Sequence, residues 1–212
     1  MQKSNVVVIM KEYASNKRIK DLLKIINPLL TQKEDNIRVH LESLVNNLIT
    51  EEEYRVIETK MKLGKLCLDL EKIIPYSYAT LLFYDKEENK IYHGAAPNIP
   101  LHNFEFFNEV NDKQLFHEMI CGKAISSGNI VYSEIFSDPN CIHERTISKE
   151  QGYKSVWSIP FFQEDTIIGT FAMYQTKRKK PTKKQIFLAK QKVLEYKKEI
   201  LHLSNNLLSN EV

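Results

Sequence analysis

The sequence contains few cysteines and few glycines. Its 212 residues include three cysteines and six glycines. The cysteines are Cys67, Cys121 and Cys141, an odd number with no C-x-x-C pair, so the sequence does not predict a disulfide framework. Reduced thiols in a cytoplasmic protein are the simplest interpretation of this pattern.

A long apolar run is also missing from the sequence. The apolar run nearest the N-terminus covers residues 6–10, which is far shorter than the core of a signal peptide or a membrane span. We therefore expect a cytoplasmic protein that makes no contact with a membrane.

A strong charge of one sign is the third absence. Thirty Lys and Arg residues against 27 Asp and Glu residues give a net charge of +3, too small to predict a nucleic-acid partner. The basic run 177–180, extended by Lys183 and Lys184, is either a patch for an acidic partner or nucleic acid, or a solvated loop. Because no aromatic residues are interleaved with it, the run favours the loop.

The apolar content is sufficient for a folded core. Hydrophobic residues make up 42% of the chain, including ten Phe and ten Tyr, which suits one domain of ordinary size with an extension. Residues 1–50 are predicted to be a helical N-terminal extension, with an apolar stripe at Ile37, Leu41, Leu44 and Leu48. Such a stripe exposes apolar surface when it is unpaired, so this extension is a candidate partner-binding segment.

Residues 51–208 are predicted to form an α+β domain. Its first helix covers residues 51–74 and is preceded by a capping box, in which Thr50 and Glu53 satisfy free backbone groups. The residues after Pro75 are β-branched and aromatic, which indicates strands. The predicted strands are 78–84, 90–95, 130–135, 155–162 and 167–175, and the predicted helices between them are 116–126 and 142–151.

The last predicted helix covers residues 182–208. Thr182 and Gln185 form a second capping box at its start. Apolar residues then recur at alternating spacings of three and four, namely at Ile186, Ala189, Val193, Tyr196, Ile200, Leu203 and Leu207. This heptad stripe fits two arrangements equally well: packing within the chain, on the sheet or on helix 51–74, and a dimer seam.

A series of spaced motifs runs from Cys121 to Thr182. Its parts are Cys121-Gly122-Lys123-Ala124, Ser127-Gly128, the strand 130–135, Asp138-Pro139, Arg145, Gly152, Ser155, Trp157-Ser158-Ile159-Pro160, Ile168-Gly169-Thr170-Phe171-Ala172 and Pro181-Thr182. This series resembles the GAF domains attached to bacterial histidine kinases and diguanylate cyclases. The resemblance covers about half of the chain and depends on many positions, so it is more specific than a single glycine motif.

The resemblance implies a GAF-like, PAS-related fold. We expect an antiparallel sheet with helices 51–74 and 182–208 on one face, and short helices and loops enclosing a pocket on the other. Gly122 is expected to let its helix approach the sheet closely, Gly169 to permit a tight approach, and Gly152 to end a helix.

Family topology also implies a set of ligand contacts, although the ligand and any cofactor are unidentified. The implied contacts are Tyr92, Phe107, Phe116, Cys121, Ser155, Trp157 and Ser158. For Trp157, a place in the core is favoured over the pocket, because it is an aromatic residue at strand spacing.

Two catalytic or cofactor-bearing variants of the family are disfavoured. Cys121 and Cys141 are similar to the cysteines of the free methionine sulfoxide reductases, but this sequence lacks their histidine-rich run and their third nearby cysteine. Cys141 is separated from His143 by one residue, unlike the bilin-attaching Cys-His pair of photoreceptor GAF domains. The remaining histidines show no metal-ligand spacing.

The resemblance therefore implies a non-catalytic sensor of a small molecule in bacterial signal transduction. Because the chain ends at Val212 without an output domain, the sequence predicts signalling through a partner protein or through the helices of a homodimer, 51–74 and 182–208. Two alternatives are a thiol-dependent sulfoxide reductase and an interaction scaffold that binds no ligand.

Overall fold

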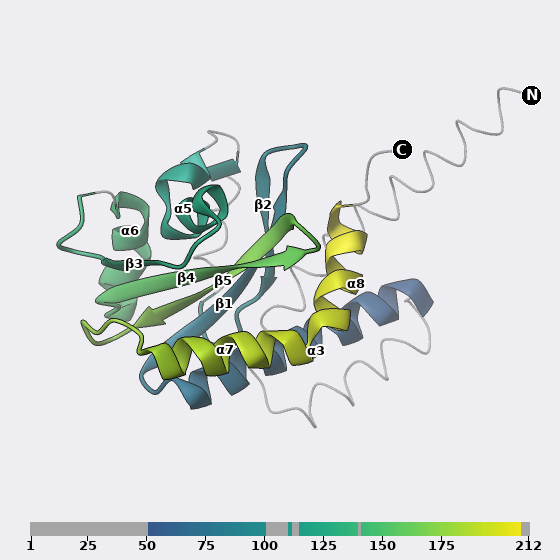
Figure 1. Ribbon diagram of the computed structural model, residues 1–212, viewed down its shortest axis with the longest axis horizontal. Helices are drawn as coiled ribbons and strands as arrows, with labels where there is room; N and C mark the ends of the chain where they lie inside the picture. Colours follow the sequence, from purple (N-terminus) through teal and green to yellow (C-terminus); the bar gives the residue numbers. More distant parts are fainter. Residues whose placement is uncertain (1–50, 101–109, 112–114, 140, 209–212) are drawn as a thin grey trace, which may run out of the picture.

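The computed structural model describes residues 51–100, 110–111, 115–139 and 141–208 (Figure 1). The expected helices of residues 1–50, the capping box at Thr50 and the candidate contact Phe107 lie outside these residues. The division into an extension, 1–50, and a domain, 51–208, stays a prediction.

A five-stranded antiparallel sheet forms the centre of the domain. The strands are β1 (Ser77–Asp85), β2 (Lys90–Ala95), β3 (Val131–Glu134), β4 (Ser155–Gln163) and β5 (Thr166–Gln175). Their order across the sheet is β2-β1-β5-β4-β3. The predicted α+β class and the five predicted strands are confirmed, with boundaries that differ by a few residues.

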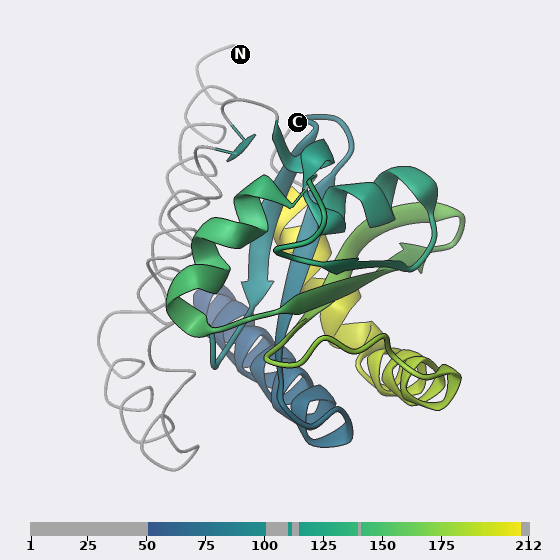
Figure 2. The ribbon, with the colours of Figure 1, turned by 90° about the vertical axis from the view of Figure 1, so that its left-hand side faces the viewer.

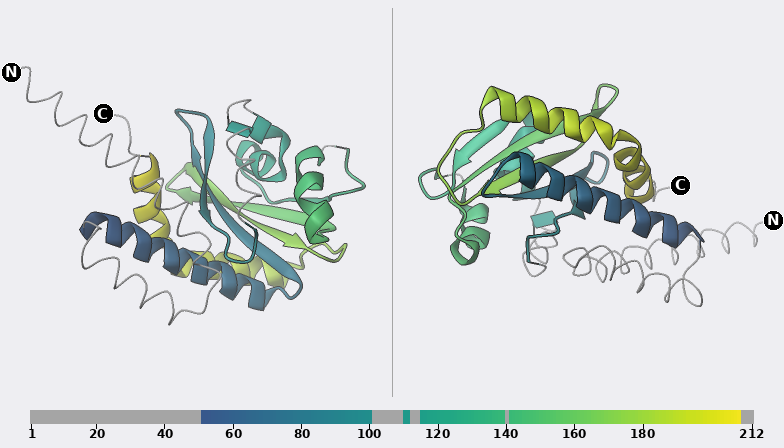
Figure 3. Two further views of the ribbon diagram at one scale, coloured as in Figure 1. Left: turned by 180° about the vertical axis from the view of Figure 1, so that it is seen from behind. Right: turned by 90° about the horizontal axis from the view of Figure 1, so that it is seen from below.

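Three helices cover one face of the sheet, as Figures 2 and 3 show. They are α3 (Glu51–Ile73), α7 (Lys183–Glu195) and α8 (Lys197–Leu208). Their inward side chains and those of the strands form one buried cluster, which we call the helix-side core. It includes Leu63, Leu66, Leu70, Phe83, Trp157, Phe171, Met173, Ala189, Val193 and Leu203.

The predicted helix 182–208 is interrupted at Tyr196, so the prediction of one continuous helix is wrong at this point. The capping box of Thr182 and Gln185 is confirmed at the start of α7. At Tyr196 the backbone N–H donates to the carbonyl of Val193, three residues back, and the chain begins the second helix. This break redirects the chain, so that α8 also packs against α3 (Figure 3).

Four residues of the heptad stripe are buried within the chain. Ala189, Val193, Ile200 and Leu203 all belong to the helix-side core, so the structure shows the intramolecular alternative for these side chains. Exposed apolar residues of α7 lie outside the stripe, among them Leu194, which is 60% exposed. The homodimer expected through these helices is untested, and it would have to use such outward residues.

Shorter elements cover the opposite face of the sheet (Figure 2). They are the 3-10 turn η2 (Leu115–Glu118), α5 (Ile120–Ser127) and α6 (Ile142–Gln151). The predicted helix 116–126 is therefore two elements. A Cβ at Gly122 would lie 1.9 Å from the carbonyl oxygen of Phe116. Gly122 thus lets α5 lie close to the preceding turn η2, because the chain folds back on itself here. The expected close contact was with the sheet, so this prediction is wrong in the partner of Gly122.

The other two glycine predictions are confirmed. Gly152 ends α6 in the left-handed conformation, with φ of 71°. A Cβ at Gly169 would lie 2.2 Å from the carbonyl oxygen of Leu82 on the neighbouring strand β1. The sheet can close around this position only because residue 169 has no side chain.

Replacing Leu203 with Ala tests the intramolecular packing of the terminal helices. Leu203 is fully buried, so its truncation should lower the free energy of unfolding by about 2–5 kcal/mol. Leu194→Ala removes the same atoms from an exposed position, so it should change the free energy of unfolding by less than about 0.5 kcal/mol. Urea denaturation of both variants measures the difference, and equal losses would contradict this arrangement of α8.

Candidate functional site

A buried carboxylate connects the two helices on the α5 and α6 side of the sheet. Glu144 is on the inner side of α6 and is 1% exposed. Its Oε1 accepts a hydrogen bond of 2.6 Å from the backbone N–H of Ile120, the first residue of α5. The N-cap residue Met119 makes no side-chain cap hydrogen bond. Glu144 therefore satisfies one of the free N–H groups of α5 and places a negative charge at its positive end.

Three buried polar atoms on this side of the sheet have no hydrogen-bond partner. They are Oε2 of Glu144, Oγ of Ser148 one turn later on α6, and Oγ1 of Thr80 on β1. Thr80 is paired across the sheet with Ala172, which packs in the same cluster as Ile147 of α6. Directly paired residues face the same side of a sheet, so Thr80 points toward α6. We call Thr80, Glu144 and Ser148 the inner polar cluster.

Apolar and aromatic side chains surround the inner polar cluster. They include Ile99, Ile120, Ile135, Ile147, Tyr153, Val156 and Tyr174. Within these surroundings, burial raises the pKa of Glu144, although the N–H of Ile120 acts in the opposite direction. Burial and the charge of Glu144 also raise the pKa of Tyr174. Buried polar atoms without partners are uncommon and cost free energy, so a group that donates hydrogen bonds to them would be bound favourably.

A second polar group holds the loop between β3 and α6. The thiol of Cys141 donates to Oγ of Ser133 at 3.2 Å, and the Ser133 hydroxyl donates to the carboxylate of Asp138. The guanidinium of Arg145 donates to the backbone carbonyls of Asp138, at 2.7 Å, and Ile135, at 3.1 Å. The Asp138 and Arg145 motif positions therefore fix this loop against α6.

The cysteine thiols are buried and remain protonated at neutral pH. Burial, with a smaller contribution from the charge of Glu144, raises the pKa of Cys121 to about 12. Burial also raises the pKa of Cys141 to about 11, and that of Cys67. All three cysteines are free of disulfides. A thiolate nucleophile is thus disfavoured at each position.

The structure separates the predicted ligand contacts onto two sides of the sheet. Phe116 and Cys121 pack together beneath α5, and the Ser158 hydroxyl donates to Thr170 at 2.9 Å. Ser158 lies on the α6 side, because it is paired with Ala172.

The other predicted contacts lie on the helix side. Trp157 is fully buried there, with its ring 6.0 Å from that of Phe171 in an edge-to-face arrangement. Ser155 shares this face, since alternate residues of a strand point to the same side. Tyr92 packs against the helix-side core. The favoured core position of Trp157 is confirmed, and its contact with a ligand, like that of the other six candidates, stays a prediction.

Sequence reasoning missed the inner polar cluster. Cys141, Glu144, Ile147 and Ser148 follow helical spacing along the buried side of α6. The helical spacing places Glu144 on the buried side of the helix, where charged residues are uncommon. This mismatch could have identified Glu144 from the sequence. Thr80 offered no comparable signal, because threonine is common in strands.

The described residues contain no group of three or more metal-ligating side chains that could hold an ion. No helix among them is long and apolar enough to cross a bilayer.

The domain therefore consists of a five-stranded sheet with long helices on one face and short helices over a partly polar interior on the other. The profile of the GAF domain family matches residues 63–191, more than half of the chain. The chain belongs to the GAF family. The resemblance stated from the motifs is therefore confirmed.

A curated relative of this GAF domain has a sensory role. It is the methyl sulfide methyltransferase-associated sensor of Methanosarcina acetivorans, 25% identical over 118 residues. The match covers 55% of this chain and only 12% of the length of that sensor, so the activity of the whole sensor does not transfer to this chain.

Solved structures share the fold at low sequence identity. The GAF domain/HD domain protein of Geobacter sulfurreducens has a TM-score of 0.51 at 12% identity, over 72% of this chain and 96% of that one. The free methionine-R-sulfoxide reductase of Neisseria meningitidis, in complex with its substrate, has a TM-score of 0.50 at 13% identity. That match covers 68% of this chain and 79% of the reductase chain. At such identities the likeness shows the fold alone.

Glu144→Gln tests the cost of the buried carboxylate. Folding raises the pKa of Glu144, so the folded protein binds this proton more tightly than the unfolded chain does. The wild type therefore loses stability as the pH rises above the pKa of a glutamate in the unfolded chain, about 4.3. Gln keeps the acceptor for Ile120 and has no charge. The stability of Glu144→Gln relative to wild type should therefore increase from pH 4 to pH 7.

Urea denaturation at several pH values measures this difference. Glu150→Gln removes the same charge from the exposed side of α6 and should change the free energy of unfolding by less than about 0.5 kcal/mol at pH 7. A relative stability of Glu144→Gln that falls as pH rises would contradict the assignment.

Proposed function

We propose that this chain is a non-catalytic sensor of a small molecule in bacterial signal transduction, with its ligand bound between the sheet and α6. The observation that carries the proposal is the inner polar cluster, in which Thr80, Glu144 and Ser148 each bury a polar atom without a partner. A ligand with hydrogen-bond donors would satisfy these atoms.

The chemistry of the cluster favours a ligand with a donor group, and above all a cationic one. Glu144 presents a carboxylate oxygen, and a nearby cation would offset the cost of its burial. The hydroxyls of Thr80 and Ser148 can accept as well as donate. An amine or amidine of modest size combines these properties.

The proposed signal passes from α6 to the rest of the domain. Glu144 is bonded to the N-terminus of α5, so a ligand that draws its carboxylate away changes the connection between the two helices. A ligand shifts such an arrangement only to the extent that it binds one state better. The output would then reach a partner protein or the dimer expected through α3, α7 and α8.

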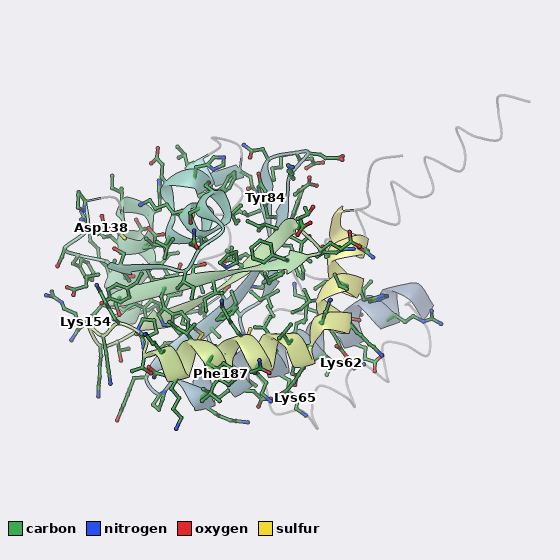
Figure 4. The ribbon with its side chains drawn as sticks, viewed as in Figure 1. Lys62, Lys65, Tyr84, Asp138, Lys154 and Phe187 are labelled. Carbon is green, nitrogen blue, oxygen red and sulfur yellow. The ribbon has the colours of Figure 1, made fainter. Side chains whose placement is uncertain are left out.

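Outward apolar residues on α7 support a protein contact on that side. Phe187 and Leu194 are both 60% exposed, and Figure 4 shows Phe187 on α7. They are seven residues apart, which places them on one side of the helix. The cytoplasmic setting is part of the same proposal and is supported by three free, buried cysteines.

A sulfoxide reductase is the enzymatic alternative, because such an enzyme shares the fold. Burial raises the pKa of both Cys121 and Cys141 far above neutral pH, which opposes formation of the attacking thiolate. A scaffold that binds no ligand would leave the cost of the inner polar cluster uncompensated. Both alternatives are therefore less well supported than a sensor.

Native mass spectrometry of freshly purified protein, followed by a thermal-shift screen of small amines and amidines, tests the sensor proposal. A ligand at one hundred times its Kd should raise the Tm by about 5–10 °C. Glu144→Gln should lose most of this shift, because it removes the charge that attracts the cation. Glu150→Gln is the matched control and should keep the shift.

The outcomes separate the alternatives. Retention of no small molecule, together with no Tm shift from any compound, would favour the scaffold. Equal shifts in both Gln variants would place the ligand away from Glu144.

Methionine sulfoxide turnover tests the enzymatic alternative directly. We expect no turnover by the reduced wild type, because both thiols are protonated and buried. Turnover that disappears in Cys121→Ser and Cys141→Ser, with unfolding curves unchanged, would establish a reductase and overturn the sensor proposal.

A further inference from the structure

A basic hollow lies at the edge of the domain where β4 begins and β5 ends. Its volume is about 670 Å³, and it is open to solvent on one side. The residues that line it are Phe136, Ser148, Lys149, Gly152, Tyr153, Lys154, Thr176, Lys177 and Arg178. Figure 4 places Lys154 at this end of the molecule, away from α8.

Four of the lining residues are cationic and none is acidic. Lys149 is in the last turn of α6, Lys154 follows Gly152, and Lys177 and Arg178 follow β5. The basic run 177–180, for which the sequence favours a solvated loop, therefore lies beside Lys149 and Lys154 at the hollow. Among the described residues, Lys149, Lys154 and Arg178 make no ion pair with a carboxylate.

The backbone around the hollow is fixed by hydrogen bonds. The N–H of Lys154 donates to the carbonyl of Gln175 at 2.7 Å, and its carbonyl accepts from the N–H of Ile135 at 3.0 Å. The N–H of Thr176 donates to the carbonyl of Tyr76 at 3.1 Å. The ammonium of Lys177 lies 3.7 Å from the ring centroid of Tyr76. The cations are thus carried by an ordered frame.

Aromatic and hydroxyl groups complete the lining. Phe136 is 42% exposed, so its ring is accessible from the hollow that it lines. Ser148, whose Oγ has no partner, forms part of the wall together with Tyr153. An aromatic surface beside several cations suits a ligand that has both phosphates and a planar ring.

We propose that this hollow, which adjoins the sensor site and shares Ser148 with it, is a second binding site for a nucleotide or a similar aromatic polyphosphate. Lys149, Lys154 and Arg178 bind the phosphate groups, and Phe136 stacks on the base. Lysine and arginine are the usual phosphate ligands of proteins, and arginine can bind two phosphate oxygens at once. The lining has four cationic residues and no acidic one. It should therefore bind a multiply charged anion more tightly than a singly charged one.

Isothermal titration calorimetry with ATP and with inorganic tripolyphosphate tests the proposal. We expect both to bind at 50 mM salt, ATP more tightly, and both more weakly at 200 mM salt because the charges are screened. The double variant Lys154→Ala, Arg178→Ala should weaken both by about tenfold or more, since it removes two charge-assisted contacts. Phe136→Ala should weaken ATP alone.

A matched control separates a site from general attraction by charge. Lys179 and Lys183 are exposed, belong to the same basic run and do not line the hollow. The double variant Lys179→Ala, Lys183→Ala has the same net charge as the test variant, and it should weaken ATP less than about twofold.

Three results would overturn the proposal. One is the absence of binding of ATP and tripolyphosphate at millimolar concentrations. Another is an equal loss of affinity in the two double variants, which would mean general charge attraction. The third is tighter binding of polyglutamate than of ATP with the same dependence on Lys154 and Arg178, which would identify the hollow as a surface for an acidic protein segment.

Discussion

Coverage of the sheet on both faces is the constraint on which this structure depends. The central strands β1, β5 and β4 are buried beneath helices on each side, so almost every side chain along them must pack in a core. The helix side is mostly apolar, with Ser155 among its buried residues, and the α6 side contains Thr80, Ser158 and Thr170. Ser158 and Thr170 bond to each other. The proposed ligand site lies on the α6 side, where these polar residues are buried.

Glu144 has one satisfied and one unsatisfied carboxylate oxygen on the second face. A carboxylate that caps α5 contributes to the fold, while its other oxygen has no partner and costs free energy at neutral pH. Natural proteins retain such costs mainly at functional sites. In contrast, the motif residue Arg145 of α6 donates to backbone carbonyls of the preceding loop, and the carboxylate of the motif residue Asp138 accepts from the Ser133 hydroxyl. They hold the frame of the site, and the motif thus reports the fold more than the ligand.

Most of the fold was predictable from the sequence, because its signals are local. Strand pattern, the Thr182 capping box and the helix end at Gly152 each depend on a few neighbouring residues. The break at Tyr196 was not predictable, since the heptad spacing continues through it and only the packing of α8 on α3 selects it. The candidate site was predicted less well. Family topology could not say which face Ser155 and Trp157 would point to, because that depends on strand register.

Helix α6 contributes residues both to the inner polar cluster and to the basic hollow. Its inner side carries Glu144 and Ser148, and its last turn carries Lys149 at the rim of the basic hollow, with Ser148 in the wall of both. If both proposed sites bind ligands, the shared helix would link them thermodynamically, since a ligand that moves α6 at one site would alter the other. Such coupling is reciprocal. A domain of this size could then report the combination of two metabolites instead of the level of one.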